Sequence, residues 1–508
     1  MNLLSSTSVF SFYTLISRVL GYIRDILIAI FLGASIFADA FFVAFRIPNT
    51  FRRLFAEGTF NAAFIPSYTS EKIKSENNGK NFADEVLTLL VLILLCIIFL
   101  IEIFMPYFVY LIAPGFYDNS DKFDLAVQLT RITFPFLLFV SLSSFFSGIL
   151  NSNNKFAAAA AAPIILNIIL ILAILISFSF DLNIVKNLSY GVTFAGILQL
   201  IFLIIFCKKY YKPSFSFKTK INSKVKFFLK KLLPSIFSSG VTQINILIGT
   251  IIASFEAGAV SYLYYADRIY QINLAIAGIA VGTVSLPILA KNLKIGNINE
   301  AMKIQNKSLE LCLLLSLPAS LGLVIASNEI INALFGYGSF SQENVNLTAD
   351  ALKYFGYGVP AFALIKVLSN FFFARDNTKT PFYLSLLSVL LNITISLTFF
   401  KKIGFIIIPI ATSISTWITV IIFFHLLVKS KFLTLKNLPL VNLIKIIFST
   451  VIMSIALYYG LDFFEDKLVY HNIYKSIYLI FMIGFMAVIY LISCYFFGVL
   501  KIKNYITK

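Results

Sequence analysis

Charged residues inside apolar segments are the most informative feature of this sequence. The stretch SRVLGYIRD, residues 17–25, carries two arginines and an aspartate in a segment apolar enough to cross a membrane. The chain has eight arginines against 33 lysines, and five of the eight fall within residues 18–53. Arginine stays charged and offers a planar fork of donors that suits phosphate oxygens. We interpret this concentration of arginine as a candidate phosphate-binding site.

Helical spacing separates the two arginines of this stretch. Ser17, Gly21 and Arg24 share one stripe of a helix, and Arg18 shares another with Asp25. Arg18 lies near the helix start, where it could snorkel to the interface. Arg24 lies about 9 Å further along, where a charge costs several kcal/mol unless it is paired or faces water. Asp25 projects about 100° away from Arg24 around the helix, so a residue of another helix could pair with Arg24 or with Asp25.

The second apolar segment has a similar set of charges. Asp39 begins it, and Arg53 and Glu57 are four residues apart, so they could pair along one helix. Arg52 is then left with no local partner. Structural ion pairs and interfacial anchors are the alternative interpretation of these charges.

A further arginine follows a tyrosine-rich run, SYLYYADR, in the eighth segment, where Asp267 precedes Arg268. Together the first, second and eighth segments would line a cationic cavity. Such a cavity suits a large anion, and a pyrophosphate-linked lipid fits because its tail can stay in the bilayer. Arg24, Arg52 and Arg268 are the candidate contacts.

The composition is that of a membrane protein. Of 508 residues, 59% are hydrophobic and 13% are charged, about half the charge of a soluble chain, and the mean hydropathy is +0.90. Apolar runs long enough to cross about 30 Å of hydrocarbon recur throughout. We predict an all-α polytopic membrane protein with 14 transmembrane helices, near residues 8–33, 38–68, 86–112, 126–150, 157–179, 188–207, 230–254, 259–290, 306–327, 349–373, 381–400, 404–428, 441–461 and 475–499.

The net charge of +18 reflects topology. With the N-terminus in the cytoplasm, the lysine-rich loops fall on the cytoplasmic side, which is the positive-inside pattern. Both termini are therefore predicted to be cytoplasmic. The loop at 208–231 alone holds nine lysines and would contact anionic lipid head groups, so we predict no nucleic-acid partner. The four cysteines and two histidines show no metal-site spacing.

The chain also repeats weakly. RLFAEGTFNAAFIPSY is echoed by AGIAVGTVSLPILAKN, and FFSGILNSNNKF by FFFARDNTKTPF, at an offset of about 222–225 residues. Asn167 and Asn392 follow in register. Two parallel lobes around a cavity are a transporter layout. We predict an N-lobe over 1–207, a basic cytoplasmic linker over 208–229, a C-lobe over 230–428, and helices 13 and 14 with a cytoplasmic tail over 429–508.

At these residues the sequence resembles the MurJ (MviN) family, the lipid II flippases of the multidrug/oligosaccharidyl-lipid/polysaccharide exporter superfamily. The segment from SRVLGYIRD to FNAAFIPSY carries most of the resemblance, and YYADRIYQ, GTVSLPIL and ARDNTKTP match further family phrases. The resemblance implies two pseudo-symmetric six-helix lobes plus two C-terminal helices. It also implies a central cavity built from helices 1, 2, 7 and 8, a groove at helices 13 and 14 for the polyprenyl tail, and alternating access in the bacterial cytoplasmic (inner) membrane.

The resemblance also implies roles for the charged residues. Arg24, Arg52 and Arg268 would contact the pyrophosphate and sugar of lipid II. The family's other charged cavity positions fall here on Arg18, Asp25, Asp39, Glu57 and Asp267.

One departure from the family concerns the energy source. Some members bind sodium in the C-lobe through acids on helices 7 and 11, but Gly249 and Ser396 stand in their places here, with Asn392 retained. Because a hard cation prefers carboxylate ligands, we predict no metal site and no cofactor. Protons or membrane potential are the alternatives to sodium.

The leading function is therefore translocation of lipid II from the inner to the outer leaflet, with lipid II and membrane lipids as partners. We expect a monomer and consider cell-wall synthesis proteins as further partners. Export of another polyprenyl-linked saccharide is the alternative, since the residues alone do not separate the head groups. A membrane glycosyltransferase would need clustered acids or a nucleotide loop, so we predict a transporter and no enzyme.

Overall fold

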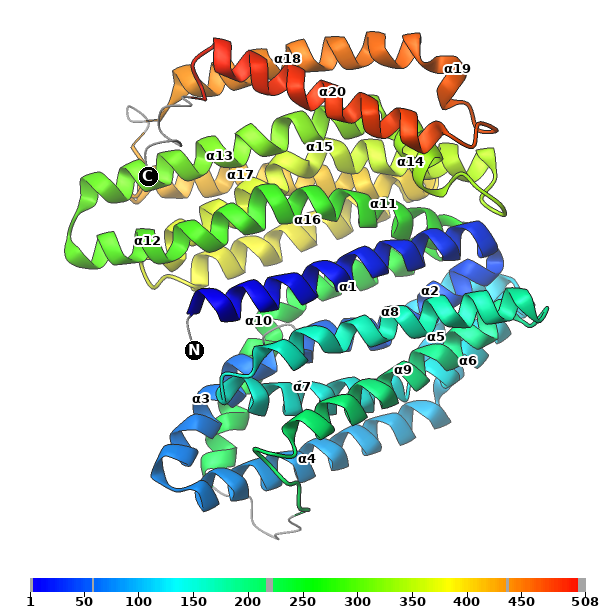
Figure 1. The fold of residues 1–508 in the computed structure, drawn as a ribbon, viewed down its shortest axis with the longest axis vertical. Coiled ribbons are helices and arrows are strands. Elements are labelled where there is room, and N and C mark those ends of the chain that lie inside the picture. The colour runs from blue at the N-terminus through cyan, green and yellow to red at the C-terminus, as the bar shows by residue number, and fades with distance from the viewer. Residues whose placement is uncertain (1–2, 57–58, 216–222, 435–437, 501–508) are drawn as a thin grey trace. The chain divides into compact units, whose positions relative to one another are not determined.

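Helices account for every regular element of the described chain. The computed structural model describes residues 3–56, 59–215, 223–434 and 438–500, and within them all regular elements are α-helices, two 3-10 turns or one π-helical turn (Figure 1). By their contacts the residues divide into two units, Met1–Ser261 and Tyr262–Lys508. The predicted all-α class is confirmed for these residues.

The helices of the first unit follow one another closely along the chain. They are α1 (Leu3–Leu32), α2 (Ile36–Ala56), α3 (Thr59–Lys74), α4 (Glu76–Ile103), α5 (Met105–Ile112), η1 (Pro114–Asp118), α6 (Ser120–Thr133), α7 (Phe136–Ser152), α8 (Phe156–Ser179), α9 (Ile184–Cys207) and α10 (Ser223–Ala253). Helix α11 (Ala259–Leu274) begins in this unit and continues into the second.

The second unit continues with the π-helical turn η2 (Ala275–Ala280). It then comprises α12 (Val281–Ile295), α13 (Ile298–Ile325), α14 (Ser327–Phe335), α15 (Gln342–Phe373), α16 (Lys379–Ile403), η3 (Gly404–Ile406), α17 (Ile407–Lys429), α18 (Leu440–Phe463), α19 (Glu465–Leu468) and α20 (Lys475–Phe496).

Ten helical segments of the described chain are long and apolar enough to cross a membrane. One of them, Lys379–Lys429, covers two of the predicted spans. Helices α1, α2 and α10 are not among the ten, and part of each lies outside the residues whose side chains the structure describes. A polytopic helical membrane protein is therefore confirmed, and the total of 14 spans stays a prediction.

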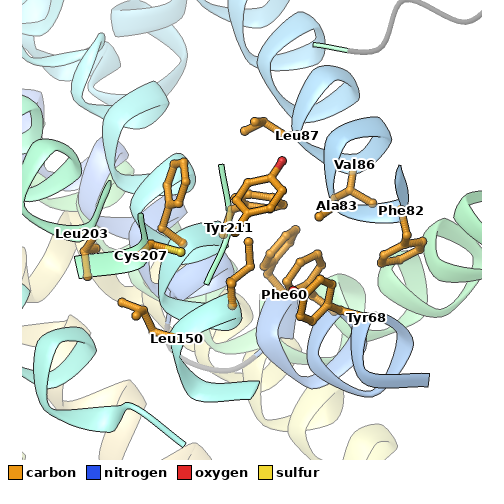
Figure 2. Close-up of a cluster of buried hydrophobic side chains, with 14 of the residues drawn as sticks. Phe60, Tyr68, Phe82, Ala83, Val86, Leu87, Leu150, Leu203, Cys207 and Tyr211 are labelled. Atoms are coloured by element: carbon orange, nitrogen blue, oxygen red, sulfur yellow. The ribbon is translucent and has the colours of Figure 1, made fainter. Parts of the chain in front are cut away.

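A cluster of aromatic side chains forms the core where α3, α4, α7, α9 and α10 meet (Figure 2). Phe64 has its ring centroid 5.2 Å from that of Phe60, 5.1 Å from Phe145 and 6.2 Å from Phe228. Such aromatic pairs each contribute roughly 0.5–1.5 kcal/mol beyond area burial. Because Phe228 belongs to α10, the start of α10 is anchored in the first unit.

Two sets of polar contacts accompany this anchoring: one holds residues 211–214, which precede α10, and the other holds α10 itself. Asp84 of α4 accepts hydrogen bonds from the Tyr211 hydroxyl at 2.5 Å and from the backbone and hydroxyl of Ser214, each at 3.0 Å. Glu71 of α3 forms an ion pair with Lys224 of α10. By its contacts α10 thus belongs to the first unit, whereas the lobe and linker boundaries proposed from the sequence stay predictions.

The Glu71 contacts make stability depend on pH. Burial raises the pKa of this carboxyl, but hydrogen bonds from Lys224 and Lys74 lower it by more, so the pKa lies below the ordinary 4.5. The stabilisation is therefore present above pH 4.5 and is lost as the pH falls through the lower folded pKa. We expect Glu71→Gln to reduce the free energy of unfolding by about 1 kcal/mol at neutral pH, and by progressively less below pH 4.5. Unfolding of the purified protein followed across this range checks it, and a loss independent of pH would contradict the ionic role.

Helix α15 is the centre of the second unit, with α13 and α17 packed along it. Where η2 crosses α15 the two backbones approach closely. A Cβ atom on Gly278 would lie 3.0 Å from the Cα of Ala363, which is a tight contact, so this crossing favours glycine. Next to it, the Asn370 side chain of α15 donates a hydrogen bond to the Gly282 carbonyl at 2.7 Å.

The C-terminal helices α18 and α20 lie side by side (Figure 1) and contact the rest of the second unit through α13 and α14. Fully buried Lys475 fixes the start of α20. Its Nζ donates to Asn332 Oδ1 at 2.9 Å, to the Gly336 carbonyl at 2.6 Å and to the Tyr470 carbonyl at 2.7 Å. Three oxygens thus match the three protons of the ammonium, which satisfies a buried cation without a carboxylate.

Turns with positive φ recur at matching places in the two units. One pair ends α7 and α15, another follows α8 and α16, and a third precedes α2 and α11. The pairs are Asn154 and Asp376 (both 59°), Asp181 and Gly404 (51° and 75°), and Gly33 and Gly258 (61° and 76°). Their members are about 222–225 residues apart, which is the offset of the sequence repeat.

Candidate functional site

Arg24 is buried inside the first unit and is bonded on two sides. Its Nε and one terminal nitrogen donate to Asp25 Oδ1 at 3.0 and 2.7 Å, and the other terminal nitrogen donates to Asn167 Oδ1 of α8 at 2.9 Å. Arg24 and Asp25 are only 4% and 2% exposed. Although the two residues differ by about 100° around the helix, the long arginine side chain reaches its neighbour.

Asn167 joins α8 to the stripe predicted on α1. Besides accepting from Arg24, its amide donates to the Ser17 carbonyl at 2.8 Å. A Cβ atom on Gly21 would lie 3.7 Å from the same amide group. The predicted stripe of Ser17, Gly21 and Arg24 is therefore confirmed, and it faces Asn167. Sequence reasoning noted Asn167 only as a repeat position and did not assign it to the site.

Arg18, in contrast, is exposed on α1, which suits the interfacial role considered for it.

The second segment is described in part. Arg52 and Arg53 lie in α2, but their side chains lie outside the described residues, and so does Glu57. The predicted pairing of Arg53 with Glu57 therefore stays a prediction.

Asp39 is fully buried at the start of α2. Its carboxylate accepts from Lys122 Nζ of α6 at 2.7 Å and from the Gly258 backbone at 2.9 Å. Ser261 adds its backbone N–H at 3.0 Å and its hydroxyl at 2.6 Å. Since Ser261 is in the first turn of α11, the carboxylate also lies at a helix N-terminus, which favours negative charge. Asp39 thus joins α2, α6 and the turn that leads into α11.

Arg46, which lies 222 residues before Arg268 and so fits the offset of the repeat, also connects two helices. It lies on α2 and donates to the Thr250 hydroxyl of α10 at 2.6 Å and to the Ile246 carbonyl at 3.3 Å. The half-buried guanidinium therefore holds α2 against α10.

In the second unit, Arg268 lies on α11 one turn after Tyr264. A terminal nitrogen donates to the Tyr264 hydroxyl at 2.8 Å, and the guanidinium carbon lies 5.0 Å from the ring centroid. Asp267 accepts a hydrogen bond from Gln271. Tyr264 and Gln271 are thus neutral partners of these two charged side chains.

Asn392 and Ser396, two of the three positions suggested by the family's sodium site, have neutral partners, and no contact joins Gly249 to them in the described part of the chain. Ser396 donates to Asn392 Oδ1 at 3.2 Å, and the Asn392 amide donates to the Thr412 hydroxyl at 3.2 Å. No carboxylate belongs to these contacts, and no group of three or more His, Cys, Asp or Glu with metal-site geometry occurs in the described part of the chain. A site with two carboxylates therefore does not fit these residues.

Lys366 is a membrane-embedded charge that sequence reasoning did not single out. It lies in α15, a helix long and apolar enough to cross a membrane, and it is exposed although most of the residues around it in α15 are buried. The signal in the sequence is a single lysine between ALI and VLSN, far from the lysine-rich loops.

Comparison with known proteins identifies the family. The family model described as "Lipid II flippase MurJ" matches residues 28–479. A "Probable lipid II flippase MurJ" of Rickettsia prowazekii (strain Madrid E) is 42% identical, covering 82% of each chain. One of Rhizobium meliloti (strain 1021) is 40% identical, covering 88% of this chain and 85% of the relative.

Solved structures agree. "Lipid II flippase MurJ, inward closed conformation" matches with a TM-score of 0.82 and 29% identity, covering 96% of this chain and 98% of the other. An inward-facing multidrug resistance MATE family transporter of the MOP superfamily matches with a TM-score of 0.67 and 14% identity, covering 81% and 93%, and it shares the fold. The chain therefore belongs to the MurJ family of lipid II flippases.

Proposed function

We propose that this chain moves lipid II, the polyprenyl-pyrophosphate-linked peptidoglycan precursor, from the inner to the outer leaflet of the bacterial cytoplasmic membrane by alternating access. The observation that carries the proposal is a buried arginine, Arg24, within the first apolar helix of a chain that matches the flippase family over residues 28–479. The family match supports a transporter and no enzyme.

Partner exchange at Arg24 is the proposed means of capturing the head group. One terminal nitrogen is bonded to the neutral amide of Asn167 and the rest of the fork to Asp25. A phosphate oxygen can replace Asn167 as acceptor and leave no charge unpaired, while Asp25 keeps the guanidinium in place. Charge-assisted bonds to phosphate are stronger than those to a neutral amide, so the exchange favours the substrate.

The other charged residues have supporting roles in this proposal. Arg52 and Arg268 supply further contacts to the pyrophosphate and sugar, and Arg18 supplies a cation at the cavity mouth. Asp39 fixes the helices around the site rather than the substrate, because its oxygens already accept from Lys122 and the α11 turn. Glu57 and Asp267 are proposed to balance the arginine charges.

The tail is proposed to stay in the membrane along the C-terminal helices. An apolar hollow of about 420 Å³ lies between the end of α13 and α18. It is lined by Ile325, Val451, Ser454, Ile455, Tyr458 and Tyr459. Its composition supports contact with a hydrocarbon chain.

We further propose 14 transmembrane helices in two six-helix lobes plus two C-terminal helices, with both termini cytoplasmic. The matched positive-φ turns support the two-lobe repeat. The neutral cluster at Asn392 argues for coupling to protons or membrane potential and against sodium. We also propose that the protein is a monomer and that it works beside cell-wall synthesis proteins.

Depletion and rescue tests the function. Bacteria depleted of their own flippase and supplied with this chain are expected to grow and to clear lipid II from the inner leaflet. Rescue should persist without a sodium gradient and fail with an uncoupler. If lipid II still builds up in the inner leaflet while a different polyprenyl-linked saccharide is cleared, the alternative exporter is supported and the proposal is overturned.

A further inference from the structure

Lys366 is an isolated cation in the middle of the second unit. Across residues 351–372 of α15, only Tyr357 and Lys366 are exposed. In the described part of the chain the Lys366 ammonium makes no hydrogen bond or ion pair, and no carboxylate is bonded to it. Charged side chains inside spanning helices face water or a partner because exposure to hydrocarbon is costly. A charged lysine at this exposed position therefore requires water or an anion.

The two exposed residues face opposite sides of α15. They are nine residues apart, which is about 180° around a helix. Tyr357 marks the outer side, where the half-exposed Trp417 of α17 donates to its carbonyl at 2.9 Å. Lys366 is thus turned away from this aromatic surface.

The side that Lys366 occupies is the one that meets the α11–η2–α12 segment. Phe362, about 40° to one side, stacks on Tyr270 of α11 with centroids 5.3 Å apart. Asn370, about 40° to the other side, donates a hydrogen bond from its side-chain amide to the Gly282 carbonyl of α12 at 2.7 Å. Lys366 therefore faces the helix that carries Arg268.

The two cations are separated along that helix. Lys366 lies at the level of residues 278–282, because Ala363 packs against Gly278 and Asn370 against Gly282. Arg268 is ten or more residues earlier, which is about 15–20 Å along the axis. In the predicted orientation Lys366 is on the cytoplasmic side of Arg268.

We propose that Lys366 is a second contact for the diphosphate-bearing head group, met on the cytoplasmic side before Arg268. The proposal rests on the proposed lipid II translocation and adds a residue that binds the substrate early. The shared chemistry is a phosphate anion, for which an anionic phospholipid head group is the other source.

Binding of fluorescent lipid II to the purified chain in phosphatidylcholine nanodiscs tests the proposal. We expect Lys366→Gln to weaken the affinity about tenfold and Lys366→Arg to stay close to wild type. Lys353→Gln, on the same helix, is the matched control and should bind as wild type. The thermal midpoint of Lys366→Gln should not change, because the ammonium has no bond to lose. A weakened affinity that comes only with a lowered midpoint would indicate a structural role and overturn the proposal.

Nanodiscs containing phosphatidylglycerol distinguish the two sources of phosphate. If Lys366 binds the lipid II head group, its substitution weakens lipid II binding equally with and without phosphatidylglycerol. A Lys366-dependent competition by phosphatidylglycerol, with no loss of lipid II affinity in its absence, would assign the residue to phospholipid and overturn the proposal. If wild type and Lys366→Gln bind lipid II with equal affinity, the Lys366 proposal is overturned and the proposed function is not. If the wild type fails to bind lipid II, the proposed function is overturned as well.

Discussion

Replacing Arg24 with alanine is expected to abolish rescue of cells depleted of their own flippase, while the wild-type chain restores growth. The substitution removes the fork proposed to hold the pyrophosphate. It also removes the buried partner to which Asp25 is bonded at 2.7 Å, which costs about 3–5 kcal/mol of stability when one side of a buried pair is deleted. Growth, lipid II in the inner leaflet and the amount of protein in the membrane are measured together.

A double substitution separates the two effects. Arg24→Ala with Asp25→Ala removes both charges, so it should recover much of the protein level and still fail to support growth. Arg24→Lys keeps the charge without the fork and should rescue poorly. Growth of cells carrying the double variant at normal protein level would show that Arg24 serves the fold alone.

Asp39→Ala is expected to reduce the free energy of unfolding by about 3–5 kcal/mol. The change leaves Lys122, whose side chain is 7% exposed, as a buried ammonium that has lost its carboxylate. It also removes the acceptor of the Gly258 and Ser261 donors, so the turn into α11 loosens. The thermal midpoint of the purified protein in detergent measures the loss.

Two comparisons make the Asp39 result specific. Asp121→Asn alters an exposed carboxylate next to Lys122 and should melt as wild type. Asp39→Asn combined with Lys122→Gln removes both charges and should recover part of the midpoint lost by Asp39→Ala. An Asp39→Ala protein with an unchanged midpoint would rule out the proposed structural role.

The sequence predicts best where one helix determines the answer. The spans near 157–179 and 188–207 agree with α8 and α9 within a few residues, because each is a continuous apolar run. The Ser17, Gly21 and Arg24 stripe is correct because it depends only on helical spacing. The span near 86–112 is divided at Phe104, where Pro106 in the first turn of α5 favours a new helix start.

Contacts between distant segments are beyond this kind of reasoning. Asn167 is 143 residues from Arg24, and Lys122 is 83 from Asp39, so no local pattern relates them. The resemblance placed Asp39 among the cavity charges, whereas its four hydrogen bonds became visible only with the neighbouring helices. Lys366 was missed for a related reason, since a lone lysine acquires meaning only when its side of α15 is known.

The π-helical turn η2 has a consequence for chain length. Its i→i+5 bonds accommodate one residue more than regular α-helix does, and one residue is about 100° of rotation. A single wheel drawn through residues 259–295 would therefore place the side chains of α12 on the wrong faces relative to Arg268. Conversely, loss of one residue within Ala275–Ala280 could restore a regular helix and keep the present angle between Arg268 and Gly282 around the helix axis. The second repeat can thus lose a residue here, inside a membrane span, without turning the face of α12 relative to Arg268.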